Sequence, residues 1–230
     1  MTELIIFDKD GTLMELGSVG VKLADDLINE FSARSNIHVP KSEIKDAFGL
    51  IDDQLDKVLR AESVKAIVER LRVLPEGDRM ADWTLNQMEH LSADNEASDI
   101  EIIPGVKETL QRLKEAGYKM AIVSADDQQS MNLFLDKFEL SSYFDLVITS
   151  DNTHYQKPQK ALIDEIVSKL NVTASEVVMV GDTEMDVMLG RNGQVKKVIG
   201  VLSGSGDRQD LRDADLLLGS VGEIQIDQIK

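Results

Sequence analysis

The chain has 230 residues, a formal net charge of −17 and no cysteine. This length can bury a substantial core, as one large domain or two modest ones. The acidic balance argues against nucleic-acid binding, the lack of cysteine excludes disulfides, and no apolar run approaches the ~18 residues that span a bilayer. The first residues also lack the pattern of a signal peptide. We therefore expect a cytoplasmic protein with no nucleic-acid or membrane partner.

The first expected element is a buried strand over 4–7, which runs directly into Asp8 and Asp10. Four apolar residues in a row are typical of a parallel strand covered on both faces. Side chains two residues apart on a strand point the same way, so both carboxylates are expected at one site. Asp10-Gly11 between two apolar runs is also typical of a hairpin turn, and this segment alone leaves both interpretations open. Lys9 is expected to point away from both aspartates as a surface charge.

The segment from about 17 to 95 shows helical periodicity almost throughout and no strand pattern. Helices are expected over 21–31, from Pro40 onward, and over 62–74 and 80–91. The polar residues at 96–99 mark a return linker.

From residue 102 onward, strands and helices alternate. Strands are expected over 118–123, 145–149, 176–180, 197–201 and 215–218, and helices over 106–116, 129–138, 159–170 and 185–192. This alternation implies right-handed crossovers and a parallel sheet, to which the strand over 4–7 also belongs. The predicted fold class is α/β, a Rossmann-like doubly wound parallel sheet with an inserted all-helical cap domain. We place the core at residues 1–14 and 100–230, and the insert at 15–99.

Four of the expected core strands are followed by residues that can carry chemistry. They are Asp8 and Asp10, then Ser124, then Lys157, and finally Asp182 and Asp186. Because the carboxyl ends of parallel strands meet at one edge of a sheet, we expect these side chains to lie together. Carboxylate oxygens are preferred ligands of Mg²⁺, and a hydroxyl and a lysine can hold phosphate oxygens. The set therefore predicts phosphoryl transfer assisted by a metal ion.

At these residues the chain resembles the haloacid dehalogenase superfamily. Its four motifs are similar, in order, to Asp8-Lys9-Asp10-Gly11-Thr12-Leu13, Ser124, Lys157-Pro158, and Gly181-Asp182-Thr183 with Asp186. The helical insert resembles the C1-type cap of phosphoglycolate phosphatase-like and β-phosphoglucomutase-like members. The resemblance implies a Mg²⁺-dependent phosphatase, a monomer or homodimer, that acts on a small phosphorylated metabolite such as phosphoglycolate or a sugar phosphate.

The resemblance also implies a role for each residue. Asp8 is the expected nucleophile, which forms an aspartyl-phosphate and binds Mg²⁺. Asp10 is the expected general acid and then base, and it binds Mg²⁺ through its backbone carbonyl. Ser124 and Lys157 are expected to bind the phosphoryl group.

The resemblance places Asp182 on the Mg²⁺ ion, with Asp186 supporting it or binding through water. Two other functions share these core residues: a phosphomutase of the β-phosphoglucomutase type, and a non-catalytic phospholigand-binding protein with the same fold. None of Asp8, Asp10, Lys157 and Asp182 is lost, which favours an enzyme, whereas Ala125 stands where many relatives have asparagine. The segment 203–206, Ser-Gly-Ser-Gly, lacks the lysine and spacing of a P-loop and is expected to be a flexible turn.

Overall fold

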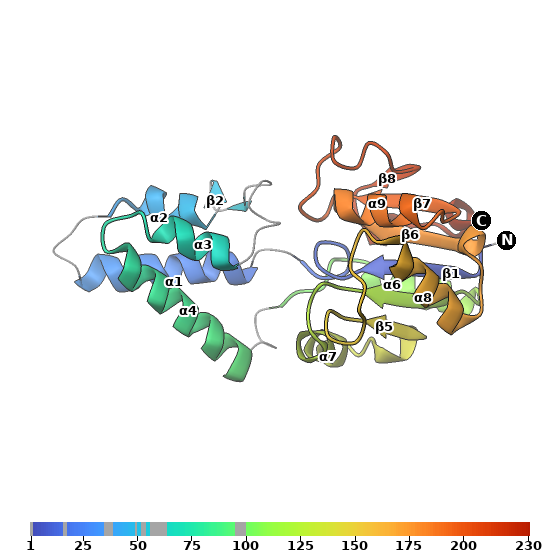
Figure 1. The fold of residues 1–230 in the computed structure, drawn as a ribbon, viewed down its shortest axis with the longest axis horizontal. Helices are drawn as coiled ribbons and strands as arrows, with labels where there is room; N and C mark the ends of the chain where they lie inside the picture. Colours follow the sequence, from blue (N-terminus) through green and yellow to red (C-terminus); the bar gives the residue numbers. More distant parts are fainter. Residues whose placement is uncertain are drawn as a thin grey trace. The chain divides into compact units, whose positions relative to one another are not determined.

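A computed structural model of the chain describes residues 2–15, 18–34, 39–48, 50–51, 54–55, 64–94 and 100–230. The chain divides into two compact units (Figure 1). The core unit comprises Met1–Glu15 and Glu101–Lys230, and the helical unit comprises Leu16–Ile100. Both junctions lie one residue beyond the boundaries expected from the sequence.

The core unit is built on a six-stranded sheet in the order β5-β4-β1-β6-β7-β8. Its strands are β1 (Leu4–Asp8), β4 (Lys119–Val123), β5 (Leu146–Ile148), β6 (Val177–Gly181), β7 (Lys197–Val201) and β8 (Leu216–Leu218). All neighbours in this sheet are parallel. In β1, Leu4 lies opposite Lys119 on one side and Val177 on the other. The hairpin interpretation of β1 is therefore wrong, because both of its partners are parallel strands distant in sequence.

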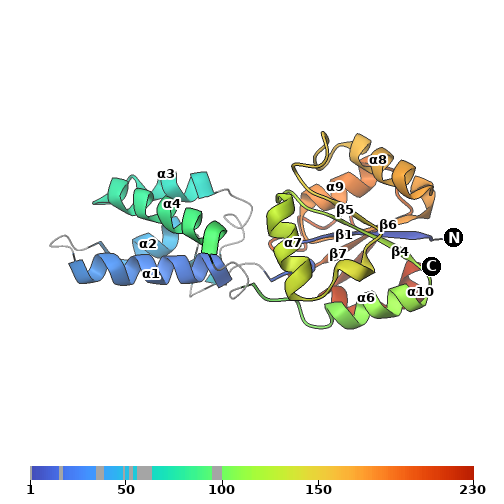
Figure 2. The ribbon, with the colours of Figure 1, turned by 90° about the horizontal axis from the view of Figure 1, so that it is seen from below.

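Helices cover both faces of this sheet. They are α6 (Val106–Glu115), α7 (Gln128–Lys137), α8 (Lys160–Leu170), α9 (Glu184–Asn192) and α10 (Ile226–Ile229), with 3-10 turns at Ser141–Tyr143, Ala174–Glu176 and Val221–Glu223. Figure 2 shows α8 and α9 on one face and α6 and α10 on the other. The face under α8 and α9 buries Leu4 and Ile6 against Ile163, Ile166 and Leu189. Every residue of β1 is buried, which accounts for the unbroken apolar run over residues 4–7.

The helical unit has its own apolar core. Its helices are α1 (Ser18–Arg34), α2 (Lys41–Ala47), α3 (Val64–Leu71) and α4 (Gly77–Asp94). Leu27, Phe31, Ile44, Leu71 and Met80 are among the buried residues that pack together there. The return linker predicted at 96–99 lies outside the described residues.

The expectation that the insert contains no strand is wrong. Strands β2 (Leu50–Ile51) and β3 (Gln54–Leu55) form an antiparallel pair within the helical unit. Strands of two residues are too short to show the alternation that identifies a strand in a sequence.

The two stretches of the core unit that lead to and from the insert lie side by side. Met14 forms an antiparallel bridge with Ile102, and the Glu15 N–H donates to the Glu101 carbonyl at 2.9 Å. The chain therefore leaves the core unit after Glu15, a few residues beyond β1. It returns at Glu101, which lies beside the point of departure. Among the described residues, none of the helices combines the length and the apolar character needed to cross a membrane.

Candidate active site

The carboxyl edge of the sheet gathers the residues predicted from the sequence. Asp8 is the last residue of β1, Ser124 directly follows β4, and Asp182 directly follows β6. Asp186 lies in the first turn of α9, and Lys157 lies in the connection between β5 and α8.

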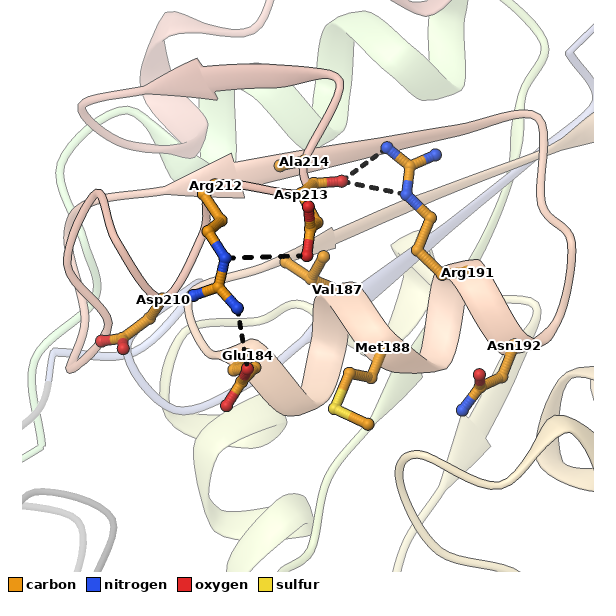
Figure 3. Close-up of a pocket in the computed structure, with 9 residues that line it drawn as sticks. All are labelled: Glu184, Val187, Met188, Arg191, Asn192, Asp210, Arg212, Asp213 and Ala214. Atoms are coloured by element: carbon orange, nitrogen blue, oxygen red, sulfur yellow. Dashed lines mark hydrogen bonds and ion pairs between the residues drawn. The ribbon is translucent and has the colours of Figure 1, made fainter.

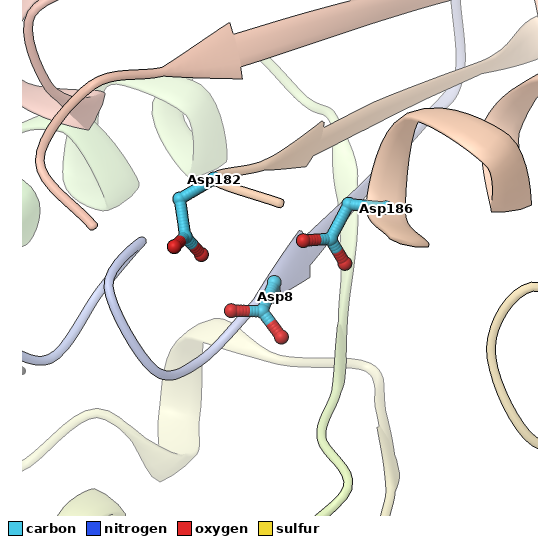
Figure 4. A group of neighbouring side chains, drawn as sticks. All are labelled: Asp8, Asp182 and Asp186. Carbon is cyan, nitrogen blue, oxygen red and sulfur yellow. The ribbon is translucent and has the colours of Figure 1, made fainter. Parts of the chain in front are cut away.

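Three buried carboxylates meet at this edge (Figure 4). Asp8, Asp182 and Asp186 each contribute an oxygen, and these oxygens all lie within 4.8 Å of one another. Burial and the neighbouring Asp186 raise the pKa of Asp182 to about 6. Burial also raises the pKa of Asp8, and the lowering effect of Lys157 does not cancel it. Crowding makes these carboxyl groups harder to ionise, because their negative charges repel one another. Carboxylate oxygens are hard ligands, so the cluster fits a divalent cation such as Mg²⁺.

Lys157 supplies the positive charge of this cluster. Its Nζ donates to Asp8 Oδ1 and, at 2.7 Å, to Asp186 Oδ1. Burial alone would lower the pKa of Lys157, but the charges of Asp186 and Asp8 outweigh burial and raise it. Lys157 is therefore an ammonium group held between two carboxylates, and such a group can bind a phosphate oxygen as a point charge.

Asp186 belongs to the site and to the start of α9 at the same time. The Thr183 N–H and hydroxyl donate to Asp186 Oδ2 at 3.1 and 2.7 Å. The Asp186 N–H donates to Thr183 Oγ1 at 3.4 Å in return, which completes a capping box. This capping box at the start of α9 therefore fixes the Asp186 carboxylate and directs its other oxygen at Lys157.

Asp182 is held by groups to which the sequence analysis assigned no role. Thr12 Oγ1 donates to Asp182 Oδ1 at 3.1 Å, and the Ser205 N–H donates to Asp182 Oδ2 at 2.8 Å. Gly11 has a φ of +82°, and a Cβ there would lie 2.5 Å from Asp182 Oδ2. Glycine is required at this position by both the backbone conformation and the close approach.

The flexible turn expected over 203–206 is instead a fixed support of the site. Besides the Ser205 contact, the Gly206 N–H donates to the Asp182 carbonyl at 3.1 Å, and Ser203 Oγ donates to the Gly11 carbonyl at 2.8 Å. The signal for this role was the position of the segment, directly after β7 at the same sheet edge. Small residues there let the backbone reach Asp182.

Asp10 and Ser124 form a second contact beside the carboxylate cluster. Ser124 Oγ donates to Asp10 Oδ2 at 3.4 Å. Burial raises the pKa of Asp10, although the neighbouring Lys9 ammonium lowers it. About a third of the Asp10 side chain, 31%, remains exposed, so this carboxyl group is accessible from solution.

The expectation that Lys9 is a surface charge is wrong. The Lys9 side chain is 1% exposed, and its Nζ pairs with Asp126 and lies 3.2 Å from Asp10 Oδ1. Alternation along a strand gives the direction in which a side chain leaves the backbone but not where a long side chain ends. The end of β1 is buried, and the buried Lys9 side chain extends from it to carboxylates at the sheet edge.

A pocket of about 530 Å³ lies beside α9, apart from the six predicted residues (Figure 3). Its two arginines are engaged by neighbouring groups. Arg191 donates to the Asp213 carbonyl at 2.9 Å and to Asp215 Oδ1 at 2.8 Å, and Arg212 lies 4.0 Å from Glu184. This internal pairing leaves the pocket without a clear preference for a charged ligand.

Comparisons with known proteins agree with this architecture. A family model described as haloacid dehalogenase-like hydrolase matches residues 5–201. Pyrophosphatase PpaX from Halalkalibacterium halodurans is 28% identical over 222 residues, which cover 96% of this chain and 94% of that protein.

Solved structures share the fold. One described as a predicted phosphoglycolate phosphatase from Haemophilus somnus is 19% identical, with a TM-score of 0.72 and 96% of both chains covered. A mutant of CbbY from Rhodobacter sphaeroides in complex with xylulose-1,5-bisphosphate is 18% identical, with a TM-score of 0.64 and coverage of 97% of this chain and 96% of that one. The family model spans most of the sequence, from β1 to the end of β7. The chain therefore belongs to the haloacid dehalogenase-like hydrolase family.

Proposed function

We propose that the protein is a Mg²⁺-dependent phosphatase that hydrolyses the phosphomonoester of a small metabolite through an aspartyl-phosphate on Asp8. The observation that carries this proposal is the meeting of three buried carboxylates with the Lys157 ammonium at the carboxyl edge of the sheet. The Asp10–Ser124 pair beside them supplies a proton carrier and a hydroxyl donor. This combination suits phosphoryl transfer, in which positioning and charge stabilisation dominate.

In this proposal Asp8 and Asp182 would hold the metal ion through carboxylate oxygens, and Asp10 would hold it through its backbone carbonyl. Asp186 supports the ion, because Lys157 and Thr183 already engage its two oxygens. The bound ion offsets the charges of the carboxylates and of the phosphoryl group.

The first half of the proposed reaction transfers the phosphoryl group to the protein. An oxygen of Asp8 attacks phosphorus, and the bond from phosphorus to the leaving oxygen breaks. Asp10 gives its proton to that oxygen, a role that suits a carboxyl group whose pKa is raised by burial. Lys157 holds the non-bridging oxygens, and Ser124 turns its single hydroxyl proton from Asp10 to one of them when the substrate binds.

The second half restores the enzyme. Water attacks the phosphorus of the aspartyl-phosphate, and Asp10, now a carboxylate, accepts the proton of that water. The bond between phosphorus and the Asp8 oxygen breaks, and inorganic phosphate leaves. Both aspartates are then in their starting states.

Substrate selection is assigned, in this proposal, to the helical unit acting as a cap. The chain leaves the core after Glu15, shortly beyond Asp10, and returns to it at Glu101, whose carbonyl accepts from the Glu15 N–H. A phosphoglycolate-type compound or a sugar phosphate is the proposed substrate. The relationship to pyrophosphatase PpaX favours inorganic pyrophosphate as a second candidate for the same chemistry.

The test is steady release of phosphate from phosphoglycolate, sugar phosphates, pyrophosphate and an aryl phosphate, with Mg²⁺ or with EDTA. Release should require Mg²⁺, and Asp8→Asn should lower it by ~10³-fold or more, because an amide cannot act as the nucleophile. Asp164→Asn is the matched control, since Asp164 is exposed on α8 and pairs with Lys160. Undiminished release by Asp8→Asn would refute the nucleophile assignment. Phosphoryl transfer between sugar positions without steady release would identify a phosphomutase.

A further inference from the structure

Four residues at the rim of the site form a closed ring of polar contacts. Lys9 Nζ lies 3.2 Å from Asp10 Oδ1 and pairs with Asp126 Oδ2. The Asp126 N–H donates to Ser124 Oγ at 3.0 Å, and Ser124 Oγ donates to Asp10 Oδ2 at 3.4 Å. Each oxygen of the Asp10 carboxylate is thus engaged by a different arm of the ring.

We propose that Lys9 and Asp126 are positioning residues, which hold Asp10 and Ser124 in one fixed arrangement for proton transfer to the leaving group. This inference rests on the proposed function and goes beyond it. It assigns a role to two residues outside the residue set proposed to contact the substrate or the metal ion.

The burial of Lys9 argues for a role other than stability. Lys9 is among the largest fully buried side chains of the described residues. Burying an ammonium is unfavourable, and an apolar side chain of similar size serves stability equally well or better at many such positions. A charge kept in this place therefore fits a requirement for orientation, and the oriented group is the Asp10 carboxylate 3.2 Å away.

Asp126, whose side chain is 40% exposed, binds the other end of the lysine and is itself held by two further contacts. Its Oδ2 also accepts a hydrogen bond from Ser130 Oγ at 3.0 Å, within the first turn of α7. Its carbonyl accepts from the Ser150 N–H, just beyond β5, at 2.8 Å. Lys9 thus connects Asp10 to the start of α7 and to the end of a neighbouring strand.

This arrangement matters at one step above all. A general acid must lie within hydrogen-bond reach of the leaving oxygen, and a small misplacement lowers the rate strongly. Substrates with a poor leaving group, such as alkyl phosphates, need the proton of Asp10, whereas p-nitrophenyl phosphate has an acidic leaving group and needs it little. Loss of the positioning residue should therefore penalise alkyl phosphates selectively.

The experiment compares kcat/KM of wild type and Lys9→Met for an alkyl phosphate and for p-nitrophenyl phosphate at saturating Mg²⁺. This parameter covers the steps up to departure of the leaving group. We expect a loss of ~10–100-fold for the alkyl phosphate and of less than ~3-fold for the aryl phosphate, because misplacing a general acid forfeits only part of the ~10²–10⁴-fold that it contributes. Asp10→Asn serves as the reference and should show the same selectivity with a larger loss.

The matched control is Lys119→Met. Lys119 is the first residue of β4, so it lies at the amino edge of the sheet, opposite the carboxyl edge that holds the site. Its Nζ donates to the Leu170 carbonyl at 2.9 Å. This variant should leave the ratio of the two kcat/KM values unchanged. If thermal unfolding measurements show that Lys9→Met is not folded, Asp126→Asn and Ser130→Ala replace it in the test. Both should show the same selectivity in weaker form.

The outcomes distinguish a failure of the positioning role from a failure of the proposed function. If Asp10→Asn shows leaving-group selectivity and the ring variants lose activity equally on both substrates, or not at all, the positioning role is wrong and the proposed function stands. If Asp10→Asn itself has no effect on either substrate, the proposed function fails at its acid.

Discussion

The charge balance around Lys157 is the central feature of the site at the scale of single residues. This ammonium bridges Asp8 and Asp186, and its own side chain is largely buried. It reduces the repulsion among the carboxylates, but it also competes with a metal ion for the same oxygens. Under the proposed function, this one residue would favour the approach of an anionic substrate and limit the affinity for the cation.

Lys157→Met is predicted to separate these two effects. Without the competing ammonium, the dissociation constant for Mg²⁺ should fall several-fold, while phosphate release should fall by ~10²-fold or more, because the phosphoryl oxygens lose a charged partner. Calorimetric titration with Mg²⁺ and steady-state phosphate release measure the two quantities. Lys160→Met, an exposed lysine paired with Asp164 on α8, should change neither. Weaker Mg²⁺ binding by Lys157→Met would contradict the competition described above.

The sequence supports the placement of single residues only in part. The apolar runs are readable, so the sequence places Asp8, Ser124 and Asp182 at the ends of strands and Lys157 in the loop that follows another strand. The prediction that Lys9 is a surface charge was wrong, because its burial depends on the length of its side chain and on a carboxylate distant in sequence. Contacts made across the sheet edge by residues far apart in sequence leave no local pattern.

At the scale of elements, the loops after β1 and β7 act together as a support for Asp182. Gly11 in the first loop and Gly204 in the second both leave no room for a Cβ beside its carboxylate. The support was not evident in the sequence, because a Ser-Gly repeat is equally typical of a mobile turn. The alternating strands and helices of the core were readable, whereas the two-residue strands β2 and β3 and the four-residue helix α10 are too short for periodicity to show.

A comparison of two glycines tests this support. Gly11 and Gly117 have nearly the same φ, +82° and +85°, but a Cβ at Gly117 would meet nothing within 4 Å. Gly117→Ala should cost only the backbone strain, ~1 kcal/mol in the free energy of unfolding. Gly11→Ala should cost ~1–3 kcal/mol more and should weaken Mg²⁺ binding, because the added methyl displaces Asp182. Chemical denaturation and Mg²⁺ titration provide the measurements, and equal effects of the two substitutions would show that Asp182 is not confined by its loops.

At the scale of the whole molecule, two sources of negative charge oppose folding at neutral pH. One is the net charge of −17, which is spread over the chain. The other is the buried carboxylate cluster, in which the pKa of Asp182 rises from 3.8 to about 6. Because the folded protein binds this proton more tightly than the unfolded chain, the cluster lowers stability above pH 6 and ceases to do so below pH 4. The shift corresponds to a free-energy difference on the order of 3 kcal/mol.

Salt and Mg²⁺ distinguish the two sources. In ~1 M NaCl the Debye length is ~3 Å, so repulsion between surface charges is largely screened, whereas the buried cluster is screened much less. In EDTA at this salt concentration, the thermal midpoint of the metal-free protein should therefore rise by several degrees when the pH falls from 7 to 5. Excess Mg²⁺ should remove this rise, because the bound cation provides the opposite charge that the carboxylates lack. Asp182→Asn should also reduce it, since the variant has no proton to bind there. If the thermal midpoint of the metal-free protein at pH 7 equals or exceeds its value at pH 5, the buried carboxylates do not repel one another in the folded state. That result would contradict the metal site proposed on Asp8 and Asp182.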